Sequence, residues 1–269
     1  MSATIFRHEF RIRLRSAAVW SLGVAAIVGL YFSFFQAFAD QAALVNQMLQ
    51  DFPPQLRAAF GIDRVDLTTV EGFYSYVFLF AQLCLAIQAA NYGFGLVSIE
   101  ETELTADFLL SKPVSRAQVL TSKLLAALAS LTITNAVVWV TSLVAIAVFR
   151  GDHEYNLRAV LLLLLSIVIF QLFFLSVGLA VSLLVRRVRS VTPYGLGLGF
   201  GAYVLSAFTG LLGDVKLELI TPFRHLDAVR IAQETAYDAP LVLLDVAVSL
   251  ICLVLSYLLY LRRDIRAVS

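Results

Sequence analysis

The chain carries few charged residues: Asp, Glu, Lys and Arg make up 14% of its 269 residues, against roughly one quarter in soluble domains. Hydrophobic residues make up 60% and gather in runs of about 20, the length that a helix needs to cross the hydrocarbon core of a bilayer. Because a bilayer offers no hydrogen-bond partner to an open backbone, such runs predict helices. The composition excludes an ordinary soluble domain and predicts an all-α polytopic membrane protein.

Cysteine is also scarce, and the usual catalytic signatures are absent. The two cysteines, Cys84 and Cys252, lie inside apolar runs and exclude a disulfide framework. The three histidines lie on separate segments, so a metal site built from them is not expected. No phosphate-binding loop, zinc-protease motif or serine-hydrolase elbow occurs in the sequence. We therefore expect a non-catalytic chain that binds no metal or cofactor itself.

Six apolar runs are long enough to cross a membrane, and they leave no room for a separate soluble domain. The first run follows four arginines, but it is longer than the apolar core of a signal peptide and has no clear cleavage site, so we expect an uncleaved span. Residues 1–269 are thus predicted to form a single transmembrane domain. The predicted spans lie at about 17–39, 73–97, 124–149, 159–185, 191–213 and 240–261.

Basic residues in the short connections set the predicted orientation. With the N-terminus inside, the inner segments hold 13 of the 20 Lys and Arg residues, and the outer segments hold 13 of the 19 acids. Both termini are therefore predicted to be cytosolic. Residues 1–16 mix arginines with aromatic and aliphatic residues, which predicts an amphipathic interfacial helix on the inner leaflet. A simple basic flank is the alternative for this segment.

Ionisable residues are almost absent from the predicted spans. Asp245 is the one acid among them, and it follows the outer start of the sixth span, where the helix dipole favours a negative charge. It is either a solvated helix-start residue or a functional group, since acids inside membranes are functional candidates. An ion-coupled carrier needs buried ionisable groups near the midplane. The sequence therefore favours an energy source outside the chain.

Four glycines alternate along the fifth predicted span. No strand precedes them, which excludes a dinucleotide-binding loop. Gly195 with Gly199, and Gly197 with Gly201, form overlapping GxxxG pairs, which let membrane helices approach closely. They predict packing within one subunit, a contact between two subunits, or a bending point near a pathway.

One polar island, residues 98–123, separates the second and third spans. Acidic residues come first, a short apolar knob follows, and a Pro-containing turn leads to Ser115, which with Gln118 forms a capping-box pattern for a new helix. A compact apolar knob ringed by charge is typical of a docking element. The alternative is a solvated loop whose knob packs under its own bundle. The acids are Glu100, Glu101, Glu103 and Asp107, and the knob is Phe108, Leu109 and Leu110.

This island and a later motif together resemble the permease subunit of a type-2 ATP-binding-cassette (ABC) transporter, in the bacterial exporter family. Many relatives have Gly-Thr where this chain has Leu104-Thr105, but the resemblance covers nearly the whole chain. The late motif also predicts a helix start, with Thr221 as N-cap and Pro222 as the first helical residue. The residues that carry the resemblance are Glu100-Glu101, Thr105, the stretch from Leu109 to Arg116, and Thr221-Pro222-Phe223.

The resemblance implies an assembly of two permeases and two ATPase subunits in a bacterial plasma membrane, with ATP and magnesium bound by the ATPases. Residues 101–112 would be the coupling helix, and a second copy or a homologous permease would complete a pathway lined by spans two and five. The implied coupling residues are Glu100, Glu101, Glu103, Asp107, Phe108, Leu109, Leu110 and Arg116. The implied pathway residues are Phe32, Phe35, Tyr74, Phe78, Gln82, Phe200, Tyr203 and Phe208.

The leading functional prediction is export of an amphipathic or hydrophobic compound, driven by ATP hydrolysis on the partner subunit. The alternative is a mechanotransmission or regulatory subunit that relays ATPase motion to an external enzyme or metal-delivery protein without conducting a substrate. An ion-coupled carrier is a third hypothesis. No nucleic-acid partner is expected, whereas an external accessory protein fits the second hypothesis.

Cysteine accessibility tests the orientation, with Cys84 and Cys252 first replaced by alanine. Cysteines introduced in place of Gln50 and Arg230 are expected to react with an impermeant maleimide in intact cells, because both positions lie in predicted outer segments. A cysteine in place of Lys112 is expected to react only after the membrane is opened. Labelling of position 112 in intact cells would reverse the predicted orientation.

Overall fold

The computed structural model describes residues 2–51, 53, 65–102, 114–185, 188, 190–209 and 219–262. Within these ranges the regular structure is helical and contains no strand. Six helices are long and apolar enough to cross a membrane, which confirms the prediction of an all-α polytopic membrane protein with six spans. The six are α1 (Ala3–Phe32), α5 (Val70–Thr102), α7 (Arg116–Phe149), α8 (Leu157–Leu184), α9 (Val191–Thr209) and α12 (Ala239–Arg262).

Four short helices connect or extend the long ones on the side away from the termini. The first apolar run, predicted as one span to residue 39, is interrupted by a turn at Ser33 and Phe34. The short helices are α2 (Phe35–Asp40), α3 (Ala42–Gln50), α10 (Pro222–His225) and α11 (Ala228–Glu234).

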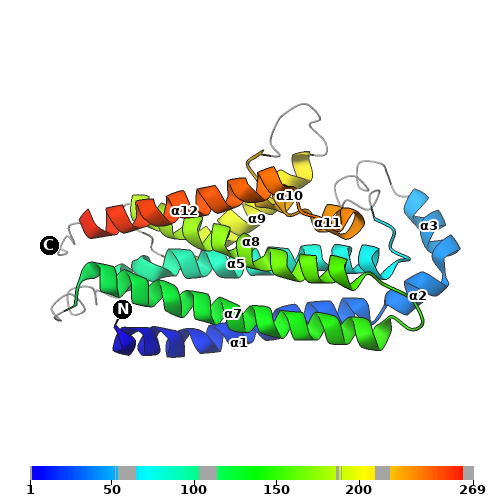
Figure 1. The fold of residues 1–269 in the computed structure, drawn as a ribbon, viewed down its shortest axis with the longest axis horizontal. Helices are drawn as coiled ribbons and strands as arrows, with labels where there is room; N and C mark the ends of the chain where they lie inside the picture. Colours follow the sequence, from blue (N-terminus) through cyan, green and yellow to red (C-terminus); the bar gives the residue numbers. More distant parts are fainter. Residues whose placement is uncertain are drawn as a thin grey trace.

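The bundle is organised around α5. This helix packs against α8 and α9 on one side and against α1 on another, while α1 pairs with α7 and α8 pairs with α12. The start of α1 and the end of α12 lie at the same end of the bundle, which we call the terminal end (Figure 1). Helices α2, α3 and α11 lie toward the opposite end, which we call the distal end (Figure 1).

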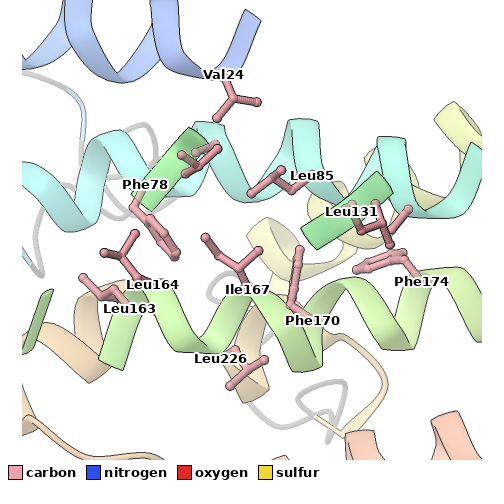
Figure 2. Close-up of a cluster of buried hydrophobic side chains, with 14 of the residues drawn as sticks. Val24, Phe78, Leu85, Leu131, Leu163, Leu164, Ile167, Phe170, Phe174 and Leu226 are labelled. Carbon is pink, nitrogen blue, oxygen red and sulfur yellow. The ribbon is translucent and has the colours of Figure 1, made fainter. Parts of the chain in front are cut away.

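Two glycines allow α5 and α8 to pack backbone against backbone. A Cβ atom built on Gly93 would lie 2.2 Å from the carbonyl oxygen of Leu175, and one built on Gly178 would lie 2.9 Å from that of Ala90. Real Cβ atoms do not approach oxygen so closely, so any larger residue would push the two helices apart. Large apolar side chains fill the remaining contact, including Phe78 of α5 beside α8 (Figure 2).

The N-terminal residues do not form the separate interfacial helix that the sequence predicted. Helix α1 is continuous from Ala3 to Phe32, so the prediction of a separate interfacial helix over residues 1–16 is wrong. Its first turns are held against α7 instead, because the backbone N–H of Ser2 donates a 2.8 Å hydrogen bond to Ser122 Oγ and Arg13 is buried.

Both predicted helix starts are confirmed. Ser115 Oγ accepts a 3.2 Å hydrogen bond from the N–H of Gln118, and Gln118 Oε1 accepts a 3.1 Å bond from the N–H of Ser115, which completes the capping box of α7. Thr221 is the N-cap of α10 and Pro222 is its first residue. The Thr221 hydroxyl does not cap its own helix, however; it bonds to a neighbouring helix, as described below.

The alternating glycines of α9 face two different surroundings. A Cβ atom on Gly195 would lie 2.1 Å from Asn91 Oδ1, and one on Gly199 would lie 2.8 Å from Ile87 Cγ1, so both glycines pack against α5 of the same subunit. Gly197 and Gly201 have nothing within 4 Å of such an atom. Packing inside the subunit thus accounts for the first pair, and a contact between subunits stays a prediction.

Replacing Gly195 and Gly199 by leucine is expected to destabilise the permease, because overpacking a close contact typically costs about 1–3 kcal/mol. Replacing Gly197 and Gly201 by leucine is the matched control, compared on the monomeric permease, since these positions open onto free space within one subunit. Thermal denaturation in detergent, followed by size-exclusion chromatography, measures the difference. Equal melting temperatures for the two double variants would contradict this account of the α5–α9 contact.

Candidate functional site

Five of the eight predicted pathway residues lie together in the core of one subunit. Phe32, Phe35, Tyr74, Phe78 and Gln82 all have 0% of their surface exposed. The rings of Phe32 and Phe35 stack at 5.3 Å, and Tyr74 lies 5.7 Å from Phe78. In this conformation the aromatic residues of the set pack α1 and α2 against α5, and none of the five residues has a surface facing an open passage. Their role in a pathway stays a prediction.

The other three predicted pathway residues lie on α9. Phe200 and Phe208 are 48% and 49% exposed, whereas Tyr203 is partly buried. The Tyr203 ring lies 6.2 Å from Phe200 and 5.6 Å from Phe223. Helix α9 therefore presents an aromatic face to its surroundings, and Tyr203 joins that face to the inside of the bundle.

A short segment, residues 221–226, connects the helices of the distal half; we call it the hub. Its first residue, Thr221, donates a 3.1 Å hydrogen bond through Oγ1 to the carbonyl oxygen of Ala202 in α9. Its aromatic residue, Phe223, is buried with its ring 4.9 Å from that of Phe170 in α8. These contacts fasten the hub to two of the long helices.

The last two residues of the hub reach two further helices. The carbonyl oxygen of Leu226 accepts a 3.0 Å hydrogen bond from Gln82 Nε2 in α5, and His225 contacts Asp245 in α12. Gln82, predicted as a pathway residue, thus serves in this conformation to hold the hub. One segment of six residues therefore contacts four of the six long helices.

The contact between His225 and Asp245 is a buried acid–base pair. Nδ1 of His225 lies 2.7 Å from Oδ1 of Asp245, and the two residues are 4% and 0% exposed. The interpretation of Asp245 as a solvated helix-start residue is therefore wrong, since the hub shields it from solvent. Removing a carboxylate from water is expensive unless a partner compensates it, and the imidazole is that partner.

Sequence analysis missed His225 because it considered the histidines only as metal ligands. A usable signal was present: a lone acid inside a span requires a polar partner, and His225 stands three residues after Pro222 in a motif that was already singled out. Among the residues that the structure describes, no group of three or more His, Cys, Asp or Glu side chains is placed to hold a metal ion.

Further polar contacts fasten the distal end beyond the hub. Asp227 caps α11 by accepting hydrogen bonds from the N–H groups of Val229 and Arg230, at 3.0 and 3.2 Å. The hydroxyl of Tyr237 donates to the carbonyl oxygen of Leu162 in the part of α8 near the distal end. Burial raises the pKa of Tyr237 to about 12, so this hydroxyl keeps its proton and remains a donor at neutral pH.

The terminal end has its own buried charge network, centred on Lys123 of α7. Lys123 Nζ donates a 2.7 Å hydrogen bond to the carbonyl oxygen of Leu96 in α5 and lies 3.8 Å from Glu9 Oε1 in α1. Glu9 also pairs with Arg13. Sequence analysis had counted these residues only toward the charge of the inner segments. Together they join the ends of α1, α5 and α7. Helices α5 and α7 lie on either side of the polar island, and α1 contains the first span.

Three of the eight predicted coupling residues lie within the described part of the chain, at the facing ends of α5 and α7. Arg116 is the first residue of α7 and is partly buried. Glu100 and Glu101 belong to the last turns of α5. The remaining residues, Glu103, Asp107, Phe108, Leu109 and Leu110, lie outside the described residues, so their docking role stays a prediction.

A comparison of the sequence with models of protein families identifies the family of this chain. The family model described as "ABC-2 family transporter protein" matches residues 3–265. This chain belongs to the ABC-2 family. The comparison with curated proteins gave no match. The chain is thus the transmembrane permease of an ABC transporter and a multi-pass membrane protein, and membership implies an ABC ATPase as its partner.

Replacing His225 by alanine in this ABC-2 permease is expected to cost about 3–5 kcal/mol of stability, because it leaves the Asp245 carboxylate buried without a partner. The double variant His225→Leu/Asp245→Leu is expected to be considerably more stable than the single variant. Unfolding in mixed micelles with increasing denaturing detergent measures both.

The control for this experiment is Arg230→Ala. Arg230 is paired with Glu234 and Asp238 at 2.9 and 2.6 Å, but it is exposed on the surface. Exposed pairs contribute about 1 kcal/mol or less. If His225→Ala lowered the free energy of unfolding no more than this control, the buried pair would not be needed to hold the hub in place.

Proposed function

We propose that this permease exports an amphipathic or hydrophobic compound, using ATP hydrolysis on a separate ATPase subunit, in a bacterial plasma membrane with both termini in the cytosol. The chain itself is proposed to be non-catalytic, with ATP and magnesium bound by the ATPase. The observation that carries the proposal is the arrangement at the terminal end. There α5 and α7 flank residues 103–113 of the polar island, which we call the acidic segment, and both helices are joined to α1 through Lys123.

Both helices beside residues 103–113 extend beyond their apolar runs. Helix α5 continues five residues past the predicted span end at 97, and α7 begins eight residues before the predicted start at 124. At about 1.5 Å per residue these extensions measure about 8 and 12 Å. Two rigid helical arms of this length would carry the segment between them away from the membrane, toward a cytosolic ATPase.

A chain of direct contacts would transmit a displacement of these two helical extensions to the distal half of the bundle. Helix α5 has 33 residues, a length of about 50 Å, and its side chain Gln82 holds the hub through Leu226. The hub in turn is bonded to α9 and α12. ATPase-driven movement of α5 would therefore shift the hub and the helices that it joins.

The pathway is proposed to form between two permeases. The outer face of α9 carries exposed Phe200 and Phe208 and the open positions Gly197 and Gly201, which suits close approach of a second copy or a homologous permease. Apolar and aromatic side chains dominate this face, which supports an amphipathic or hydrophobic substrate. Asp245 is the seventh of the 24 residues of α12, away from the midplane position at which an ion-coupled carrier needs its ionisable groups, and this argues against such a carrier.

A second candidate function has one observation in its favour. Helices α2 and α3 project from the distal end (Figure 1), and α3 contains no charged residue. Leu44 and Met48, one turn apart on α3, are 51% and 58% exposed. Such a surface would suit an external accessory protein, as required if the permease relays ATPase motion instead of conducting a substrate.

The double variant Phe108→Ala/Leu109→Ala tests the coupling role of the acidic segment. If this apolar pair docks on the ATPase, truncating it should cost about 2 kcal/mol or more, roughly thirtyfold in affinity. The variant is expected to insert normally but to recover less ATPase in a pull-down from detergent. ATP hydrolysis by the complex of this variant with the ATPase should no longer respond to transport substrates.

The matched control is Leu44→Ala/Met48→Ala at the distal end, which should leave ATPase recruitment unchanged. Normal recruitment and coupling by the Phe108/Leu109 variant would move the docking site elsewhere. The same reconstituted complex separates the two functions. Hydrolysis stimulated by apolar solutes favours export, whereas hydrolysis that responds only to an external protein, and is lost in the distal variant, favours mechanotransmission.

A further inference from the structure

The exposed side of α1 is apolar along most of its length. Val19, Leu22 and Leu30 are 65%, 70% and 65% exposed, and they follow one another at helical spacing on the side away from buried Val24 and Val28. In a chain that spans a membrane, a face of this composition is covered by lipid acyl chains. This part of α1 therefore faces the hydrocarbon core.

The same side of the helix turns basic toward the N-terminus. Arg15, Arg11 and Arg7 precede Val19 at intervals of four residues, and all three are exposed. Steps of four residues keep side chains on one side of a helix, with about 6 Å of rise for each step. Because α1 is continuous through this region, the arginines form a ladder about 12 Å long that begins where the apolar face ends.

No acid in the described part of the chain neutralises this ladder. Glu9 is the one acid among the first 39 residues, and it is turned inward, where it pairs with Arg13 and lies near Lys123. No ion pair between a described acid and Arg7, Arg11 or Arg15 is present. Helix α1 thus separates its charges, with a compensated inner side and three uncompensated guanidinium groups outside.

We propose that the ladder formed by Arg7, Arg11 and Arg15 binds the phosphate headgroups of anionic phospholipids. Guanidinium groups bind phosphate oxygens in a bidentate manner, and arginine side chains reach along an apolar surface to the headgroup level. A phospholipid satisfies both parts of the face at once, because its acyl chains cover Val19 and Leu22 while its phosphate meets the arginines. A soluble anion would leave the apolar part uncovered.

The bound lipid would also fix the position of the network behind it. The inner side of the same helix turns carries Glu9 and Arg13, which join α1 to Lys123 at the start of α7. An anionic lipid that holds the outer side of α1 would therefore steady the terminal end at the point where α7 leaves the acidic segment. This role concerns the permease alone and does not depend on which substrate it carries.

Fluorescence quenching by brominated lipids tests the proposal without any ATPase. A reporter permease carries Val19→Trp with Trp20→Phe, so that the new indole lies one turn from Arg15, while Trp139 contributes the same signal to every variant. The reporter is reconstituted in vesicles of phosphatidylcholine that contain increasing amounts of brominated phosphatidylglycerol. Brominated phosphatidylcholine, titrated in parallel, gives the reference affinity of a neutral lipid.

The reporter is expected to bind phosphatidylglycerol about fivefold or more tightly than phosphatidylcholine, since each basic residue near an anionic surface contributes roughly a fivefold preference. Replacing Arg7, Arg11 and Arg15 together by glutamine should bring the ratio close to one. Lysine at the same three positions should retain only part of the preference, because it keeps the charge but not the bidentate geometry, and the control Arg158→Gln, at the distal end, should leave the preference unchanged.

Two results would overturn the proposal. One is equal affinity of the reporter with its unmodified ladder for the two lipids, a measurement that needs no arginine variant to fold. The other is an unchanged preference for phosphatidylglycerol in the glutamine variant.

Discussion

The close contact between α5 and α8 is the constraint on which the rest of the bundle depends. Gly93 and Gly178 let the two backbones touch, and α5 then becomes an axis with other helices on its remaining sides. A membrane offers no hydrophobic driving force between helices, so shape complementarity of this kind has to hold them together. Gly195 and Gly199 permit the same close packing of backbones between α9 and α5.

Polar groups complete the assembly at both ends of this axis. Toward the distal half, the hub bonds to α5, α9 and α12 through Gln82, Thr221 and the buried pair of His225 with Asp245. At the terminal end, Lys123 joins α7 to the carbonyl of Leu96 in α5 and to Glu9 in α1. A buried charge that lost its partner would be costly, so these contacts specify one arrangement of helices that apolar packing alone would leave free to slide.

Under the proposed function, the two networks would also let one small subunit link a cytosolic ATPase to the opposite side of the membrane. Helix α5 contacts both of them, and it is long and rigid enough to transmit a displacement between them. The permease needs no soluble domain for this purpose. Three surfaces are proposed to bind partners: the acidic segment binds the ATPase, the aromatic face of α9 contacts a second permease, and the arginine ladder on α1 binds lipid.

The sequence by itself determined the fold class, the six spans, both helix starts and the family, because run length, capping residues and short motifs are local properties that need no knowledge of neighbours. Tertiary structure alone decided which residues meet. It turned Asp245 from a solvated acid into half of a buried pair, placed Phe32 and Phe78 in the core, and assigned Gly195 to α5. It also made residues 3–16 part of α1, because contacts with α7 outweigh the local tendency of an amphipathic segment to lie on the membrane. Partners far apart in the chain leave no periodic signal; the lone acid in the sixth span indicated that Asp245 needs a polar partner, but only the tertiary structure showed that this partner is His225.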